Sequence, residues 1–468
     1  MKRNNSNFIL FICFFLYALT ICISLFGHNS IALLMLIVCS ILELLGVKRY
    51  IGYYNNVILI FIAFSFLYGL SGPIVALWGK QFLPVFGNNF DFGSWFLSYS
   101  LSEMALLLSL VIFYRKDDLN NDNDKIEINE NKINYLAKIS YIIMLLGSIF
   151  QLINMYRIGG FTALFMDKAV YQSRETDLTL TLPVTQFVNI SIACISLYIG
   201  YCRFKKNKIN KSIIIKEIIF SIPYLLQILL LGQRGNLLSM FIIFFVGFYY
   251  FKPLKHLKGK VLIIAILLYL LSVFLYTNRG ITSLISNDRN LFYNKVSDIS
   301  RYVDNINPGS NEFSVPFGNY NTVIISGHYN YKYGESYLRG LLLSVPSFLY
   351  PGTKPVQITY EFRNNYFASF GEKSSISGTA FSSILEAYWN FGYVGVFVMY
   401  FIYGMVIIYI EKTHKKKKEF YKLFYLLFTA SIVSFSRTQL GGIINVLLYT
   451  FIYMTITVIF PYQLRKNK

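Results

Sequence analysis

Charged residues are scarce in this chain. Asp, Glu, Lys and Arg make up 14% of its 468 residues, whereas hydrophobic residues make up 55% and aromatic residues 18%. Soluble domains carry roughly 25% charged residues, so this composition excludes an ordinary soluble protein. Apolar runs of about 20 residues recur along the chain, and a helix of that length crosses a bilayer. We therefore predict an integral membrane protein.

Cysteine and histidine are also few. The five cysteines lie in or beside apolar runs, and the four histidines are scattered. This placement excludes a disulfide framework, and no spacing of these residues matches a metal site. The cysteines are Cys13, Cys22, Cys39, Cys194 and Cys202. We predict neither a bound metal nor a cofactor.

The apolar runs predict an all-α membrane fold of about twelve spanning segments. Each segment should be a helix, because backbone groups exposed to lipid must form their hydrogen bonds within the segment. The predicted spans are 8–26, 31–46, 57–77, 96–113, 135–155, 184–202, 213–231, 236–251, 261–277, 383–410, 421–435 and 440–460.

These spans divide the chain into three parts. Residues 1–277 hold the first nine helices, with an outer loop at 156–183 and a polar cytoplasmic linker at 114–134. Residues 278–382 form one large outer loop, in which apolar positions at helical spacing predict amphipathic helices. Residues 383–468 hold the last three helices. A loop of this size is too long for a simple connection, and it resembles a lid over a site.

Acidic residues are outnumbered, 23 against 43 basic ones. Most of the basic residues fall in loops on one side of the predicted membrane, and that side is expected to be cytoplasmic. Both termini lie on it. The net charge of +20 is therefore mainly a topology signal, and scattered basic residues in short loops do not favour binding of nucleic acid.

Arginine is enriched on the opposite, outer side, where its planar fork suits phosphate or carboxylate. Arg234 in "GQRGN" and Arg437 in "SFSRTQLGG" stand on minimal turns beside glycines. An ionisable residue held at the membrane edge is a functional candidate, although it can also extend to lipid headgroups. Arg157, Arg279 and Arg363 are further candidates on the same side.

The order of spans, the Gly-x-Arg-Gly hairpin, the long outer loop and the stretch "SGTAFSSILEAYWNFGYVGVFVMYFIYG" at 377–404 resemble the Wzy-type O-antigen and capsule repeat-unit polymerases. The resemblance implies a GT-C-like glycosyltransferase in the bacterial cytoplasmic (inner) membrane. Its substrate would be an undecaprenyl-pyrophosphate-linked oligosaccharide, from which the growing glycan moves onto a new repeat unit. Its partners would be membrane lipids and, in some systems, a chain-length regulator.

Such a transfer needs a base for the attacking hydroxyl and cations for the leaving pyrophosphate. We predict Glu386 as the base, with Glu103 and Glu361 as alternatives, and Arg234 and Arg437 as catalytic cations. Arg279, Arg363 and Arg157, with Tyr388, Trp389 and Asn390, are predicted to bind substrate. The equal alternative for Glu386 is an ion pair with an arginine that holds helices together. The pair Glu175-x-Asp177 is read as a surface loop rather than a metal site.

Two other functions remain open on the sequence alone. An O-antigen ligase shares the layout and differs in the acceptor, which the sequence does not show. A flippase or transporter of the same lipid-linked sugars usually contains internal repeats and polar residues at the midplane, and neither stands out in this sequence.

Overall fold

The part of the chain that the structure describes is entirely helical. The structure is a computed structural model, and it describes residues 2–78, 90–114, 129–165, 184–205, 209–230, 234–256, 259–278, 289–306, 313–326, 331–345, 350–366, 381–414 and 419–466. No strand occurs within these ranges. The prediction of an all-α fold is confirmed for them.

A helix lies at each of the twelve predicted spans. These helices are α1 (Lys2–Leu25), α2 (Asn29–Ile51), α3 (Val57–Trp78), α4 (Phe92–Phe113), α6 (Glu130–Ile158), α8 (Val184–Lys205), α9 (Lys211–Leu230), α10 (Arg234–Phe248), α11 (Gly259–Thr277), α18 (Ser383–Thr413), α19 (Glu419–Val433) and α20 (Leu440–Met454). The π-helix η7 (Thr455–Ile459) and α21 (Phe460–Lys466) continue α20. Among the described residues, nine helices are long and apolar enough to cross a membrane. α10, α11 and α19 are not among those nine, so the count of twelve stays a prediction.

Local sequence sets several helix ends. The side chains of Asp91, Asn129 and Ser382 accept hydrogen bonds from backbone N–H groups in the first turns of α4, α6 and α18. Such caps satisfy donors that have no partner within the helix. Gly52 and Gly159 follow α2 and α6 with φ of 100° and 149°, a backbone region that favours glycine.

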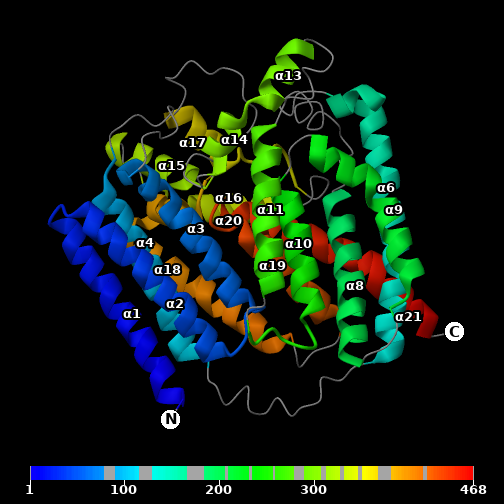
Figure 1. The fold of residues 1–468 in the computed structure, drawn as a ribbon, viewed down its shortest axis with the longest axis horizontal. Coiled ribbons are helices and arrows are strands. Elements are labelled where there is room, and N and C mark those ends of the chain that lie inside the picture. Colours follow the sequence, from blue (N-terminus) through cyan, green and yellow to red (C-terminus); the bar gives the residue numbers. More distant parts are fainter. Residues whose placement is uncertain are drawn as a thin grey trace.

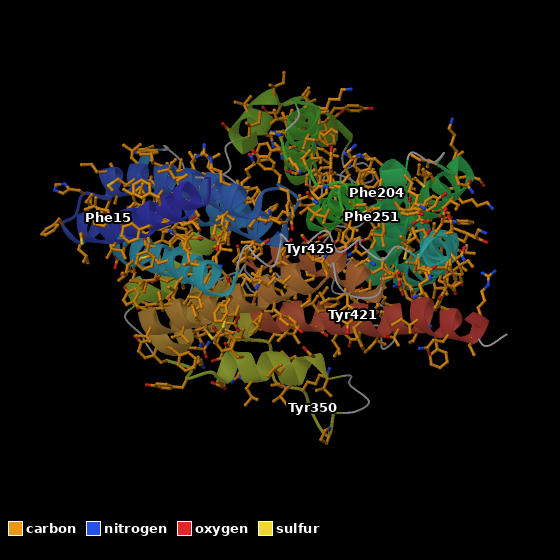
Figure 2. The ribbon with its side chains drawn as sticks, turned by 90° about the horizontal axis from the view of Figure 1, so that it is seen from below. Phe15, Phe204, Phe251, Tyr350, Tyr421 and Tyr425 are labelled. Atoms are coloured by element: carbon orange, nitrogen blue, oxygen red, sulfur yellow. The ribbon has the colours of Figure 1, made fainter. Side chains whose placement is uncertain are left out.

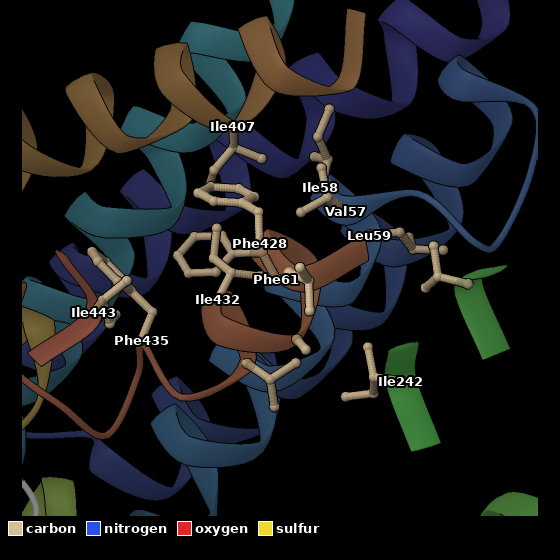
Figure 3. Packing of buried hydrophobic residues seen from close by; sticks show 14 of the residues in the cluster. Val57, Ile58, Leu59, Phe61, Ile242, Ile407, Phe428, Ile432, Phe435 and Ile443 are labelled. Carbon is tan, nitrogen blue, oxygen red and sulfur yellow. The ribbon is translucent and has the colours of Figure 1, made fainter. Parts of the chain in front are cut away.

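The spans form two groups that meet at α19 and α20 (Figure 1). α1, α2, α3, α4 and α18 pack together on one side, and α6, α8, α9 and α10 pack on the other. α19 touches both groups, through α3 on one side and α8 and α10 on the other. Figure 3 shows the apolar core at this junction, where Phe61 of α3, Ile407 of α18, Phe428 and Ile432 of α19 and Phe435 lie together.

Large apolar side chains also cover the rim of the molecule. Phe15 on α1 is 61% exposed, whereas Tyr425 in the interior is 2% exposed (Figure 2). Many aliphatic residues of α9 and α11 are exposed in the same way. A soluble protein rarely exposes contiguous apolar surface on this scale, so this rim is a surface for lipid.

The described residues of the segment predicted as a large loop form five helices. They are α13 (Arg289–Ser297), α14 (Ile299–Ile306), α15 (Val315–Ser326), α16 (Glu335–Ser344) and α17 (Ile358–Tyr366). α15 does not lie on the surface. Its Phe317 and Tyr320 are fully buried, Phe317 packs edge-on against Trp95, and Tyr320 shares a hydrogen bond of 2.6 Å with Ser98 of α4.

The first predicted outer loop, 156–183, contains a short 3-10 helix, η3 (Gly160–Phe165). Residues 166–183 of that loop lie outside the described residues, as do residues 115–128 of the polar linker predicted at 114–134. α6 begins at Glu130, so the end of that linker is helical.

Candidate functional site

Arg437 lies on the short turn between α19 and α20. Its backbone N–H donates to the carbonyl oxygen of Ser434 at 3.0 Å, which closes the turn. The neighbouring Phe435 is buried, and its ring packs edge-on against Phe61 at 5.7 Å and Tyr403 at 4.5 Å between centroids. The turn is therefore fixed on the core of the bundle, with the Arg437 side chain half-buried at its surface.

An apolar cavity of about 350 Å³ lies beside this turn. It is lined by residues of α3, α10 and α11, with Phe313, Gly235 and Arg437. Arg437 is the charged residue among the described residues of this lining, and Tyr68, Tyr269 and Ser272 supply hydroxyl groups. An apolar space bordered by one guanidinium suits an amphiphile with a long apolar part and an anionic head.

The N-terminus of α10 borders the same cavity. Arg234 is the first residue of α10, and the next residue, Gly235, lines the cavity. The Arg234 side chain lies outside the described residues. The N-terminus of α10 and the turn that carries Arg437, about 200 positions apart in sequence, thus border one apolar space.

Glu386 lies in the first turn of α18 and is fully buried. Its Oε2 accepts a hydrogen bond of 2.7 Å from the backbone N–H of Leu440, the first residue of α20. Its Oε1 accepts one of 2.9 Å from the Ser336 hydroxyl of α16. A carboxylate at a helix N-terminus satisfies a free N–H donor and interacts favourably with the helix dipole. Within the described part, Glu386 pairs with an amide and a hydroxyl, and no lysine or arginine bridges to it.

Asn390 extends this network by one helical turn. It is fully buried, and its Nδ2 donates to the Ser336 hydroxyl at 2.6 Å and to the Glu386 carbonyl oxygen at 2.7 Å. Its Oδ1 accepts from the backbone N–H of Gly334 at 2.8 Å. Directly after it α18 kinks, with Gly392 at φ 62°. Asn390 thus fixes the start of α16 against the kinked α18.

Tyr388 and Trp389 are 5% and 3% exposed. The Trp389 ring packs edge-on against Phe362, and the Tyr388 ring packs at 5.2 Å from Tyr320. In this conformation both rings hold the loop helices against α18. Their predicted contact with a sugar stays a prediction and requires that these rings become accessible.

Four charged residues tie α16 to α17. Lys332 and Arg339 both form ion pairs with Glu361, and the Arg339–Glu361 distance is 2.6 Å. Arg339 also pairs with Glu335. Burial acts to raise the pKa of Glu361, but the hydrogen bonds and charges of Lys332 and Arg339 outweigh it and lower the pKa below its usual range. The Lys332 ammonium also lies 5.4 Å from the centre of the Trp389 ring. In this structure, Glu361 therefore forms ion pairs that hold α17 to α16.

α16 and α20 touch through two glycines. A Cβ on Gly340 would lie 2.6 Å from the Cα of Gly441, a separation that real structures do not show. Only glycine at both positions lets the two backbones approach so closely. This approach brings Ser336 of α16 within reach of Glu386 and the start of α20.

The remaining predicted residues lie apart from this network or outside the described part. Arg157 is exposed in the last turn of α6. Arg363 belongs to α17, but its side chain and all of Arg279 lie outside the described residues. Glu103 is buried between α4 and α3, where it accepts a hydrogen bond from Ser65.

Metal binding has little support from the described side chains, which include no group of three or more His, Cys, Asp or Glu residues that could hold an ion. Glu175 and Asp177 lie outside the described residues.

Sequence reasoning missed Ser336 and the Leu440 amide as partners of Glu386. A serine gives no signal by itself, and a backbone N–H gives none at all. The glycines in "YLRGLLL" and "QLGGIIN" were the available signal, because small residues at membrane helix interfaces mark close contact.

The helices and the lipid-facing rim define a multi-pass helical membrane protein. Comparison with known families gives the particular class. The model of the O-antigen polysaccharide polymerase Wzy family matches residues 5–468, and the chain belongs to that family. No curated protein and no solved structure matches it significantly.

Proposed function

We propose that this protein joins undecaprenyl-pyrophosphate-linked oligosaccharide repeat units into a surface polysaccharide at the outer face of the bacterial cytoplasmic membrane. The growing glycan leaves its lipid carrier and moves onto a new lipid-linked repeat unit. The product is an O-antigen, a capsule or an exopolysaccharide. In this topology both termini and most of the basic loops are cytoplasmic, and the Arg437 turn faces outward.

One observation supports the proposal of a lipid-linked substrate. The apolar cavity between α3, α10 and α11 has Arg437 in its lining and the N-terminus of α10 at its border. A polyprenyl chain fits the apolar lining, and its pyrophosphate would then stand near the guanidinium. Arginine binds phosphate oxygens through paired, charge-assisted hydrogen bonds. The Arg234 side chain, at the N-terminus of α10, is proposed as the second cation.

The proposed reaction is a displacement at an anomeric carbon. The acceptor hydroxyl oxygen forms a bond to that carbon, the bond from the carbon to the pyrophosphate oxygen breaks, and a base takes the hydroxyl proton. Charge grows on the pyrophosphate as it leaves. A fixed guanidinium stabilises that charge most in a site that excludes water. Arg437, half-buried on a rigid turn, meets this requirement.

Glu386 has two proposed roles, to position the Arg437 turn and to act as the base, and its contacts bear on them differently. It holds the N-terminus of α20, and so the Arg437 turn, through the Leu440 amide. As the base it would have to face an acceptor hydroxyl, which requires that α16 move away, because Ser336 and Leu440 occupy its oxygens and the residue is fully buried here. The structure supports the positioning role directly, and the base role stays a prediction.

Deletion of the gene in its own host tests the function. Loss of the long polysaccharide ladder, with single repeat units still delivered to the surface, supports the polymerase. Full-length polymer retained on its lipid carrier would instead indicate a ligase. Lipid-linked repeat units trapped on the cytoplasmic side would indicate a flippase. Either of the last two results overturns the proposal.

A further inference from the structure

α14 is a short amphipathic helix, with its apolar residues on one side and polar residues on another. Ile299, Val303 and Ile306 are 74%, 59% and 44% exposed and fall within one side of the helix. Ser300 and Asp304 lie on a different side, because each residue turns the helix by about 100°. No described residue covers the apolar stripe, so its large exposed side chains need an apolar neighbour from outside the chain.

Hydrogen bonds fix α14 alongside α11. Arg301 donates to the Thr277 carbonyl oxygen at 3.1 Å, and the Tyr302 hydroxyl donates to Asn278 Oδ1 at 2.9 Å. The hydroxyl of Tyr269, about two turns earlier on α11, donates to the Ile306 carbonyl oxygen at 2.5 Å. α14 therefore runs beside the last turns of α11 and does not stand above its end (Figure 1).

The surface of α11 identifies what lies beside α14. Ile263, Leu267, Leu270 and Phe274 of α11 are 43–59% exposed, and they belong to an apolar helix in a membrane protein. An exposed apolar surface of this kind is suited to acyl chains. The exposed stripe of α14 begins beside the same turns of α11, so it continues this lipid-facing surface at the membrane edge.

We infer that the Ile299–Val303–Ile306 face of α14 inserts among the acyl chains of the leaflet that meets this end of the bundle. This is the geometry of an interfacial amphipathic helix, with its apolar side in the hydrocarbon boundary and its polar side towards water and headgroups. The inference does not depend on the proposed function, because it rests only on the membrane location and on the contacts of α14.

The insertion would join the bilayer to the candidate site. Tyr269 holds the end of α14 and also lines the cavity, and Phe313, the next described residue after α14, lines it too. α14 thus lies where a lipid chain would pass between the leaflet and the cavity. Only this consequence rests on the proposed function.

Fluorescence in lipid nanodiscs tests the insertion. Val303→Cys in a variant without the five native cysteines is labelled with the polarity-sensitive dye NBD, and Asp304→Cys on the polar side is the matched control. Insertion predicts blue-shifted emission at 303, loss of fluorescence with lipids that carry a nitroxide near the headgroup, and protection from iodide. The label at 304 should show the reverse.

A label at 303 that iodide quenches and nitroxide lipids do not would overturn the inference and would indicate a face for a protein partner. Ile299→Cys repeats the test if the first variant does not fold, as judged by its elution as a single species in detergent. Because neither readout involves polymer synthesis, failure here leaves the polymerase proposal untouched, and failure of the polymerase proposal leaves this result interpretable.

Discussion

The Glu386 carboxylate accepts a hydrogen bond of 2.7 Å from the backbone N–H of Leu440. Leu440 starts α20, three residues after Arg437, so the acid and the cation predicted for the reaction are joined through the backbone of one short turn. Ser336 binds the other oxygen of the same carboxylate and brings in α16. These contacts connect α16 to the backbone that carries the arginine.

Glu386→Gln and Ser336→Ala separate positioning from proton transfer. If Glu386 only positions the turn, both variants should lower the rate by a similar, moderate factor, and both should keep the pH profile of the wild type. If Glu386 is the base, Glu386→Gln should lose roughly 10²–10⁴-fold in rate and should also lose the acidic limb of that profile. Rates of polymer extension across pH distinguish the two results. A normal rate and profile in Glu386→Gln would exclude both roles.

Gly441→Ala should destabilise the protein, because its new Cβ would collide with the backbone of Gly340. Overpacking of this kind costs about 1–3 kcal/mol. Gly442→Ala is the matched control, since the nearest atom to its Cβ is Gln439 Cγ at 3.9 Å. Thermal unfolding in detergent should show a lower midpoint for Gly441→Ala only. Equal unfolding midpoints for the two variants would show that the backbones of α16 and α20 do not meet at Gly340 and Gly441.

Acid should weaken the contact between α16 and α17. The folded-state pKa of Glu361 is lowered, so this group stabilises the fold above its ordinary pKa of 4.5, and the contribution is lost as pH falls below that value. Glu361→Gln should therefore flatten the fall of the unfolding midpoint on acidification. Glu335→Gln is the matched control, because this side chain is 43% exposed and its loss leaves both bridges to Glu361 in place. If the unfolding midpoint of Glu361→Gln fell with acid as much as that of the wild type, Glu361 would not be the source of the acid sensitivity.

Narrowing the cavity should impair use of the lipid-linked substrate. Ala265 on α11 lines the cavity, so Ala265→Phe fills part of it. Leu267→Phe places the same ring on the 59% exposed outer side of the same helix. In detergent-purified protein, Ala265→Phe should raise the KM for the lipid-linked repeat unit, whereas Leu267→Phe should leave it unchanged. The same KM in the wild type and both variants would show that the cavity does not bind the lipid carrier.

The fold could be predicted from sequence because its main signal is local. Apolar runs bounded by charges place a helix at every predicted span, and the short turn at Arg437 also follows from the pattern. The burial of α15 did not follow, because Asn319 and Asn321 make it look like a surface helix, although both are buried against the bundle. Such burial depends on partners far away in sequence.

The candidate site was only partly predictable for the same reason. Arg234 and Arg437 are predicted on similar turns, and in the structure Arg437 and Gly235, the residue after Arg234, line one cavity. Tyr388, Trp389 and Asn390 were expected to meet sugar, but the aromatic rings pack against loop helices and Asn390 is held in a buried network. The sequence shows that such residues suit sugars, but it does not show that other parts of the chain already occupy them.

Reconstituted polymerisation tests the central claim most directly. Purified protein in liposomes receives one defined undecaprenyl-pyrophosphate-linked repeat unit, and products are resolved on a gel. The wild type should give a ladder of polymer on the lipid carrier. Arg437→Ala should lower the initial rate by about 10²–10³-fold, as expected for loss of one preorganised donor to a leaving group, and Arg437→Lys should recover part of it. A ladder of normal length and rate from Arg437→Ala would contradict the account.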